Sequence, residues 1–230
     1  GAEGDDDLNY TVMGLRVLEK YGPNFRTLDV GYQWLESMPV NWTYGPERTA
    51  YMNLARFTEF HDRWGDYDFD TVWKVTHHLH ESSELIGAQI RADAFGYVAA
   101  CLPELAAEWG WRDGALTHVK NGIYGEMLWA AIIAAAFGAS SIREAIEIGL
   151  AEIPENCRLA EATRNTLQWW DETADWRAVY ERIAEAFIEK SGNMDQLKNV
   201  VRDVLRNKYP LRSAGAAQEN LQGRGVRSNS

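Results

Sequence analysis

The sequence predicts an all-α protein, and three observations carry that prediction. Apolar residues recur with helical spacing along most of the chain. Alternating strand patterns bounded by Asn-Gly or Asp-Gly turns are absent. The segment from Met127 to Phe137 is apolar on all sides, as is typical of a helix buried at the centre of a bundle. We expect that helix to be the axis of the core.

The expected helices follow from apolar periodicity and from residues that start or stop helices. Tyr21-Gly22-Pro23 pairs a glycine suited to a C-cap with a proline that cannot continue a helix. Pro103 can begin a helix, because its missing N–H is not needed in the first turn. In chain order, the expected helices are Leu8–Tyr21, Leu28–Ser37, Pro46–Phe60, Phe69–His80, Pro103–Trp109, Gly122–Phe137, Ile142–Glu152, Arg158–Trp170, Trp176–Ile188 and Met194–Asn207.

The length and composition predict one helical domain over residues 1–210 and a tail over residues 211–230. A chain of 230 residues with 46% hydrophobic content can bury a sizeable core. From Ser213 onward the residues are mostly Ala, Gly, Gln, Asn, Ser and Arg, with hardly any large apolar side chain. Such a segment cannot offset the entropy lost on ordering, so we expect it to be disordered.

Charge and cysteine content exclude several classes of function. Acidic residues outnumber basic ones by 34 to 23, which argues against a nucleic-acid partner. Cys101 and Cys157 have no C-x-x-C spacing, so neither a zinc site nor a disulfide framework is implied, and we expect a cytoplasmic location. The longest apolar run is about half the length of a membrane helix, so no membrane partner is expected. The oligomeric state is not indicated.

The most informative local feature is the triplet Asp5-Asp6-Asp7, which precedes the first helical pattern. At the turn that enters a helix, adjacent carboxylates can converge, and crowded carboxylates raise one another's pKa unless a cation neutralises them. Oxygen ligands favour Mg²⁺, Mn²⁺ or Ca²⁺ over zinc. Aspartates are also common as N-caps, where they accept backbone N–H bonds. The local sequence leaves both interpretations open.

Two other features suggest sites less strongly. His77-His78-Leu79-His80 is followed by Glu81 and Glu84, which would place His77 with Glu81, and His80 with Glu84, at helical spacing for a transition metal. No complete ligand set is implied, so an exposed polar face is the preferred interpretation. The ten tryptophans invite a stacking role, yet most fall at helical spacing or in pairs, as expected for packing.

Several separated segments together resemble the ADP-ribosylglycohydrolase family, in its branch of larger bacterial members. Asp5-Asp6-Asp7-Leu8-Asn9-Tyr10-Thr11 is the first. Ile86-Gly87-Ala88-Gln89-Ile90-Arg91-Ala92-Asp93-Ala94-Phe95-Gly96-Tyr97 is the second, followed by Pro103-Glu104-Leu105-Ala106-Ala107-Glu108. Leu116-Thr117-His118-Val119-Lys120-Asn121-Gly122-Ile123-Tyr124-Gly125-Glu126-Met127 completes the set. The similarity covers about residues 5–187.

The resemblance implies an orthogonal multi-helix bundle that holds a binuclear Mg²⁺ centre beside bound ADP-ribose. It implies Mg²⁺ ligands at Asp5, Asp6 and Asp7, with Asp6 and Asp7 also catalytic. Asp5 stands where the family has a hydroxyl residue. Gly87–Asp93 resembles the family's substrate loop, in which Arg91 would meet a phosphate or pair with Asp93, and Asn121 is placed one helical turn beyond His118. The implied substrate-binding residues are Gly87, Gln89, Arg91, Asp93, His118 and Asn121.

The family pattern predicts Mg²⁺-dependent hydrolysis of a glycosidic bond of ADP-ribose, although part of the pattern is not seen. The family's N-terminal segment and its C-terminal acidic motif of Asp-x-Asp-Thr/Ser type are missing, so an incomplete bundle and an incomplete second metal site are expected. Asp171-Glu172-Thr173-Ala174-Asp175 matches an inter-helix loop of the family instead. The alternatives are a non-catalytic module that binds ADP-ribose or a nucleotide, a helical interaction module, and a truncated gene product.

Overall fold

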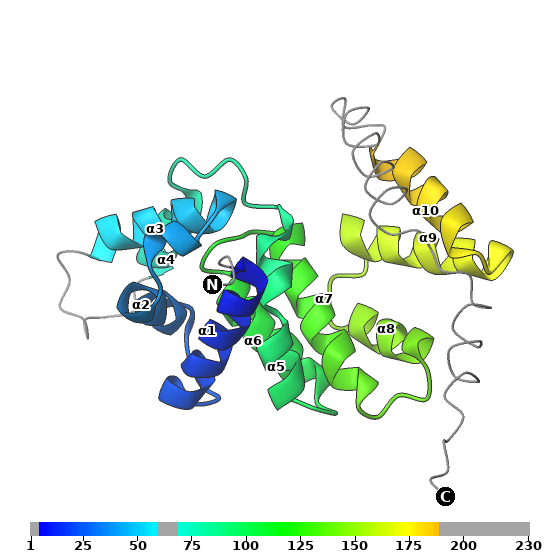
Figure 1. Cartoon of the computed structure of the whole chain (residues 1–230), viewed down its shortest axis with the longest axis horizontal. Helices are drawn as coiled ribbons and strands as arrows, with labels where there is room; N and C mark the ends of the chain where they lie inside the picture. The colour runs from blue at the N-terminus through cyan, green and yellow to red at the C-terminus, as the bar shows by residue number, and fades with distance from the viewer. Residues whose placement is uncertain (1–4, 59–68, 189–230) are drawn as a thin grey trace, which may run out of the picture. The chain divides into compact units, whose positions relative to one another are not determined.

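The computed structural model describes residues 5–58 and 69–188, and within these ranges every regular element is a helix (Figure 1). The all-α prediction is confirmed. The chain divides into two compact units, Gly1–Leu167 and Gln168–Ser230, which are described separately below. The expected helix Met194–Asn207 and the expected tail over residues 211–230 lie outside the described residues.

The described elements agree closely with the expected helices between Leu8 and Ile188. In chain order they are α1 (Asp6–Tyr21), α2 (Thr27–Ser37), η1 (Val40–Trp42), α3 (Gly45–Thr58), α4 (Phe69–His77), η2 (Ile86–Arg91), α5 (Asp93–Val98), α6 (Pro103–Gly114), α7 (Asn121–Ala136), α8 (Ile142–Ala151), α9 (Arg158–Thr173), α10 (Trp176–Ile183) and the π-helical turn η3 (Ala184–Ile188). Among these helices, none combines the length and the apolar character that a bilayer span requires.

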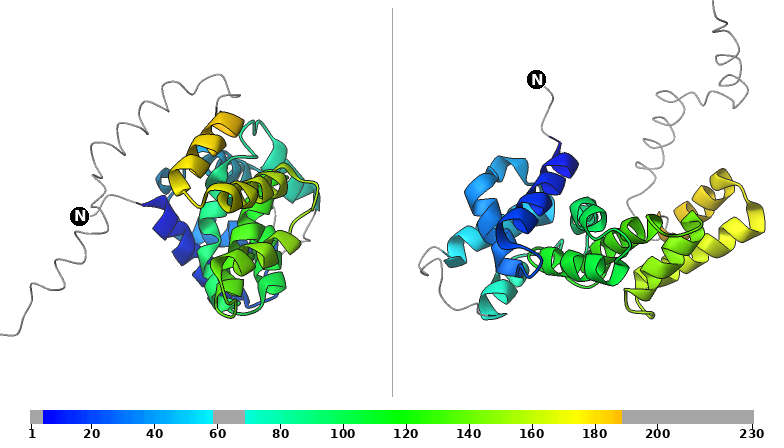
Figure 2. Two further views of the ribbon diagram at one scale, coloured as in Figure 1. Left: turned by 90° about the vertical axis from the view of Figure 1, so that its right-hand side faces the viewer. Right: turned by 90° about the horizontal axis from the view of Figure 1, so that it is seen from below.

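Helix α1 begins and ends on the signals that the sequence contains. The Asp5 side chain caps its start, and Gly22, with φ of 72°, ends it before Pro23. Its buried face consists of Tyr10, Met13, Gly14 and Val17. Within the first unit, α1 packs against α2, α5 and η2, and Figures 1 and 2 show α1 and α2 side by side. The helix thereby fixes the position of the acidic triplet at its own N-terminus.

Helix α7 is the centre of the first unit, as its all-round apolar sequence predicts. It packs against α5, α6, α8 and η2. Close approach is possible because glycines on the neighbouring helices face it: a Cβ at Gly96 would lie 2.6 Å from Ile133, and one at Gly149 would lie 2.6 Å from Ile132. Ala130, Ala131 and Ala134 are fully buried at these contacts. A larger residue at either glycine would push the helices apart.

Three local expectations are wrong in detail. Helix α4 ends at His77, and Leu79 has φ of 49°, so His77 and Glu81 do not share a helical face. The expected loop at Gly87–Asp93 is the 3₁₀-helix η2 leading into α5. Both η2 and α5 are shorter than the sequence windows in which apolar periodicity is informative. Asn121 does not follow His118 by one helical turn, because α7 begins only at Asn121.

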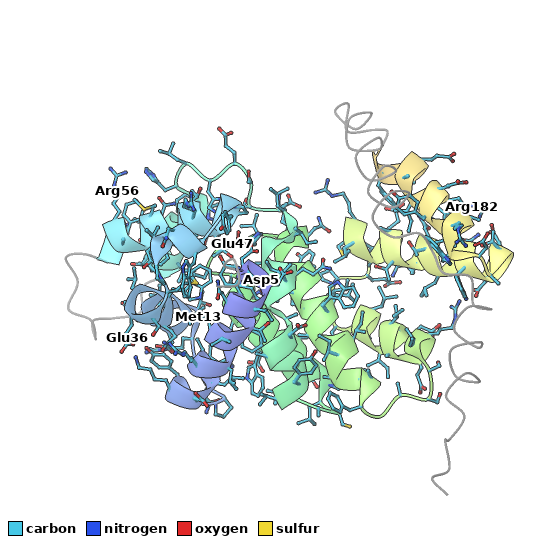
Figure 3. The ribbon with its side chains drawn as sticks, in the orientation of Figure 1. Asp5, Met13, Glu36, Glu47, Arg56 and Arg182 are labelled. Atoms are coloured by element: carbon cyan, nitrogen blue, oxygen red, sulfur yellow. The ribbon has the colours of Figure 1, made fainter. Side chains whose placement is uncertain are left out.

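In the second unit, Asp175 caps α10 by accepting a hydrogen bond from the backbone N of Arg177 at 3.0 Å. Arg182, labelled in Figure 3, forms an ion pair with Glu172. The segment from Asp171 to Asp175 therefore contains the end of α9 and the cap of α10, and the connection between the two helices is limited to Ala174 and Asp175.

Candidate active site

The acidic triplet lies at the first turn of α1, where its three carboxylates converge. One carboxylate oxygen from each of Asp5, Asp6 and Asp7 lies within 4.8 Å of the others. Asp5 and Asp7 are exposed and Asp6 is half-buried. Asp5 Oδ1 also accepts hydrogen bonds from the backbone N of Asp7 at 3.1 Å and of Leu8 at 3.5 Å. Asp5 is thus an N-cap, and the carboxylates are close enough to share a cation.

The electrostatics of the triplet favour a positive partner. Partial burial raises the pKa of Asp7, and the neighbouring charges of Asp6, Asp5 and Asp93 raise it further. Asp93 stands at the start of α5 and is half-buried. Four acidic groups therefore contribute negative potential at this point, and an oxygen-only donor set of this kind suits Mg²⁺. Within the described ranges, no second cluster of three potential metal-ligating side chains is found.

Arg91 lies in the core of the first unit, and only 1% of its surface is exposed. Its Nε donates to the Asp113 carboxylate, its Nη1 to Glu47 at 3.3 Å, and its Nη2 to Thr117 Oγ1 at 3.0 Å. The rings of Tyr10 and Trp34 lie 5.6 and 5.3 Å from the guanidinium carbon. Of the two roles considered for Arg91, a phosphate contact or a pair with Asp93, the second is not found: Asp113 on α6, which packs over η2, supplies the carboxylate.

The buried network around Arg91 contains more carboxylates than cations. Glu126 Oε2 lies 3.5 Å from Arg91 Nη2, so Glu47, Asp113 and Glu126 surround one guanidinium. Complete burial, reinforced by Asp113, raises the pKa of Glu126 well above its ordinary value. Burial also raises the pKa of Glu47, although Arg91 opposes this. The protonated form of Glu126 is therefore favoured, which reduces the charge imbalance inside the core.

His118 is fully buried beside this network. Its Nδ1 lies 2.6 Å from Thr117 Oγ1, and its Nε2 lies 3.6 Å from Glu47 Oε1. Burial, together with the positive charge of Arg91 and the nearby His80, lowers the pKa of His118 to about 2. The imidazole is therefore neutral at physiological pH.

The other residues expected at the substrate site differ in accessibility. Gly87 is buried beneath the Glu47 carboxylate, and Gln89 is half-buried beside Gly125. Asn121 Nδ2 donates to Glu84 at 3.0 Å, and its Oδ1 accepts from the backbone N of Leu159 at 3.1 Å. Asn121 therefore ties the start of α7 to the start of α9.

The turn that connects His118 to α7 has an unusual backbone. Lys120 adopts φ of 48° and ψ of −123°, and the backbone N of Gly122 donates to the carbonyl of Val119 at 3.0 Å. These angles are those of the first central position of a type II′ turn, where glycine is favoured. A lysine at this position is strained, and the hydrogen bonds of Asn121 help to hold the turn.

The side chains of His77, His80 and Glu84 each contact other groups of the first unit. His77 stacks on Trp73 with ring centroids 4.7 Å apart, and its Nδ1 lies 2.9 Å from the carbonyl of the same residue. His80 is half-buried, with Nε2 lying 3.0 Å from the carbonyl of Pro46. Glu84 is engaged by Asn121 and Arg158. His77 is exposed, as expected, whereas His80 faces the protein, so the histidines do not form one exposed polar face.

One central residue is not foreseen from the sequence. Glu47 joins Arg91, His118 and Gly87, yet in the sequence it follows Gly45-Pro46 as an ordinary acidic residue in the first turn of a helix. Acidic residues are favoured at such positions for the helix dipole alone. The buried contacts that distinguish it come from η2 and from the segment before α7.

Comparison with known proteins gives one match. A protein-family model described as ADP-ribosylglycohydrolase matches residues 2–222, which is wider than the expected span of 5–187. No curated protein and no solved structure matches the chain.

Proposed function

The chain belongs to the ADP-ribosylglycohydrolase family, and from this premise we propose that it hydrolyses the glycosidic bond at the anomeric carbon of ADP-ribose in an ADP-ribosylated substrate. The observation that carries the proposal is the convergence of Asp5, Asp6 and Asp7 within 4.8 Å at the start of α1. This cluster is accessible to solvent and consists only of oxygen donors. It is the set of side chains that a hard divalent cation and a polar substrate could reach together.

Asp6 and Asp7 would hold Mg²⁺, and Asp5 would contribute the carboxylate oxygen that does not cap α1. Bound there, the ion would supply Lewis-acid polarisation and a template for the ribose hydroxyls. A carboxylate of the Asp6–Asp7 pair accepts a proton from water as the water oxygen bonds to the anomeric carbon. The bond from the anomeric carbon to the modified group breaks, and the carboxylate returns the proton taken from water to that group as it leaves.

The substrate-binding roles divide according to burial. Gln89 and Asp93 are half-buried, and both lie in the segment formed by η2 and the start of α5. They can offer polar contacts directly. Arg91 and His118 are enclosed, and Asn121 is held by Glu84 and Leu159. These three residues would shape the site from beneath it, together with the buried Gly87.

The direct test is the release of ADP-ribose from an ADP-ribosylated protein by the Asp6→Asn variant in the presence of Mg²⁺. We expect a loss of at least about 100-fold in rate, because electrostatic groups of this kind typically contribute that much. Asp175→Ala is the matched control, since it removes an aspartate N-cap that has no role in the triplet. Unchanged release by Asp6→Asn would refute the assignment.

A binding module without turnover is the second candidate. It is favoured by the small number of convergent ligands, since the cluster found within the described ranges has three members. Calorimetry with ADP-ribose, with and without Mg²⁺, separates the two. Metal-dependent binding without hydrolysis supports the binding module, whereas absence of binding leaves a helical interaction role. The linkage cleaved, whether to arginine, serine, a dinitrogenase-type protein or a small molecule, depends on rim loops.

A further inference from the structure

Glu47 connects two segments that are far apart in the sequence and that the proposed function places beside the substrate. It stands in the first turn of α3 and is 4% exposed (Figure 3). Its Oε1 accepts a hydrogen bond from Arg91 Nη1 at 3.3 Å, which holds the carboxylate in one place. The first of the two segments is η2, and the second contains His118.

The contact with η2 is unusually close. An ideal Cβ built on Gly87 would lie 1.9 Å from Glu47 Oε1 and 2.5 Å from its Cδ. No side chain fits there while the carboxylate keeps its contact with Arg91. Because Gly87 is buried, η2 cannot shift outward without exposing its own packed face. The carboxylate of Glu47 therefore sets where the backbone of η2 lies.

The contact with His118 follows from a chain of donors and acceptors. Arg91 Nη2 donates to Thr117 Oγ1, so the Thr117 hydroxyl hydrogen can point to His118 Nδ1, 2.6 Å away. With Nδ1 as acceptor, the neutral imidazole carries its hydrogen on Nε2. Nε2 has no hydrogen-bond partner, and the carboxylate oxygen it faces is Glu47 Oε1 at 3.6 Å, just beyond hydrogen-bond distance. The opposite tautomer would turn a lone pair toward the carboxylate.

We propose that Glu47 is a positioning residue, which fixes the η2 backbone at Gly87 and holds His118 as its Nε2–H tautomer, so that the two segments keep a constant spacing around the substrate. The contacts of Glu47 are observed in the structure, and their relevance to ADP-ribose rests on the proposed function. Glu47 acts through these neighbours.

The experiment follows the His118 imidazole by NMR in the full-length chain, without substrate. We expect a slowly exchanging Nε2–H signal in the wild type, because this hydrogen is buried and faces a carboxylate oxygen. Glu47→Leu removes the carboxylate that Nε2 faces, and Gly87→Ala displaces it, so both variants should lose or strongly shift the signal. Glu47→Gln should retain it, because Arg91 holds the amide oxygen in the place of Oε1.

Glu126→Gln is the matched control, since Glu126 also approaches Arg91, at 3.5 Å, but is not among the partners of Gly87 or His118. It should leave the signal unchanged. Persistence of the signal in both Glu47→Leu and Gly87→Ala, or a wild-type Nδ1–H tautomer, overturns the proposal. If Glu47→Leu does not fold, Gly87→Ala decides the question.

A second measurement separates this proposal from the proposed function. With an ADP-ribosylated substrate, Glu47→Leu should lower kcat/KM about 10-fold, as loss of a supporting contact typically does, while Glu47→Gln should restore most of it. A wild type that shows the expected NMR pattern but no hydrolysis would refute the proposed function alone. Hydrolysis with equal kcat/KM in Glu47→Leu would refute the positioning role alone.

Discussion

The first unit contains two clusters of carboxylates, which differ in their exposure to solvent. Asp5, Asp6 and Asp7 stand at a helix N-terminus in contact with solvent, and the first-turn N–H groups are their main compensation. Glu47, Asp113 and Glu126 are buried around one guanidinium, with exposures of at most 4%. The exposed cluster is accessible to a ligand, whereas the buried cluster is enclosed in the core around Arg91. Their surroundings, more than their residue type, decide which carboxylates remain accessible to solvent.

The largest expected effect comes from breaking the buried cluster. Arg91→Met keeps much of the side-chain volume but leaves three carboxylates without their cation, so we expect a loss of about 3–5 kcal/mol in the free energy of unfolding. Asp6→Asn, in the exposed cluster, should change it by less than about 1 kcal/mol. Urea unfolding of both variants measures the contrast. Equal effects would contradict the division between supporting and ligand-binding carboxylates.

Addition of Mg²⁺ should stabilise the protein through the exposed cluster only. A ligand at 100 times its Kd adds about 2.7 kcal/mol to the free energy of unfolding. The rise in Tm on adding Mg²⁺, and its reversal by a chelator, should therefore be present in the wild type and lost in Asp7→Asn. Asp175→Ala should retain it. A rise of the same size in Asp7→Asn would place the cation elsewhere.

The pH dependence of the free energy of unfolding should report on the buried cluster. The pKa of Glu126 is raised in the folded state above its ordinary value of 4.5. The folded protein therefore binds this proton more tightly, and the contribution is present below pH 4.5 and lost as pH rises through the folded pKa. The slope for one such group reaches about 1.4 kcal/mol per pH unit. Glu126→Gln should remove this loss, as measured by urea unfolding between pH 4.5 and 9.

His118 lies beside the same network, and its contribution to stability changes with pH in the opposite direction to that of Glu126. Its folded pKa is lowered to about 2 from 6.5. The stability that it contributes is complete above pH 6.5 and declines as pH falls toward the folded pKa. Between pH 4.5 and pH 6.5 the two contributions oppose each other, so together they predict a plateau of stability there, with a decline below pH 4.5 from His118 and any decline above pH 6.5 from Glu126 alone. Stability that rose steadily from pH 4.5 to pH 9 in the wild type would contradict the raised pKa of Glu126.

The smallest expected effect on the free energy of unfolding comes from a substitution in the turn that precedes α7, because this substitution changes no charge of the buried cluster. Lys120→Gly relieves a backbone conformation that L-residues rarely adopt, so we expect a gain of about 1 kcal/mol in the free energy of unfolding. The Lys120–Glu84 ion pair that is lost is long, at 3.9 Å, and exposed, so it contributes little. Thermal unfolding measures the gain, and a decrease in Tm would indicate that the turn is unstrained.

Local signals in the sequence predict the longer helices, their order and the acidic triplet. Helical periodicity and caps are local, so Asp5, Gly22 and Pro103 mark real ends of helices. The apolar segment from Met127 to Phe137 likewise predicts a central helix. Short elements were missed, because η2 and α5 have only six residues each and contain too few periods to read.

The burial of the polar residues and the identity of their partners could be learned only from how the helices pack. Arg91 could pair with Asp93 on sequence grounds, yet it meets Asp113, Glu47 and Thr117, which arrive from α6, α3 and the segment before α7. The reason is physical: the pairing of a buried charge depends on the packing of helices that are distant in sequence, whereas caps and periodicity depend on neighbours a few residues away.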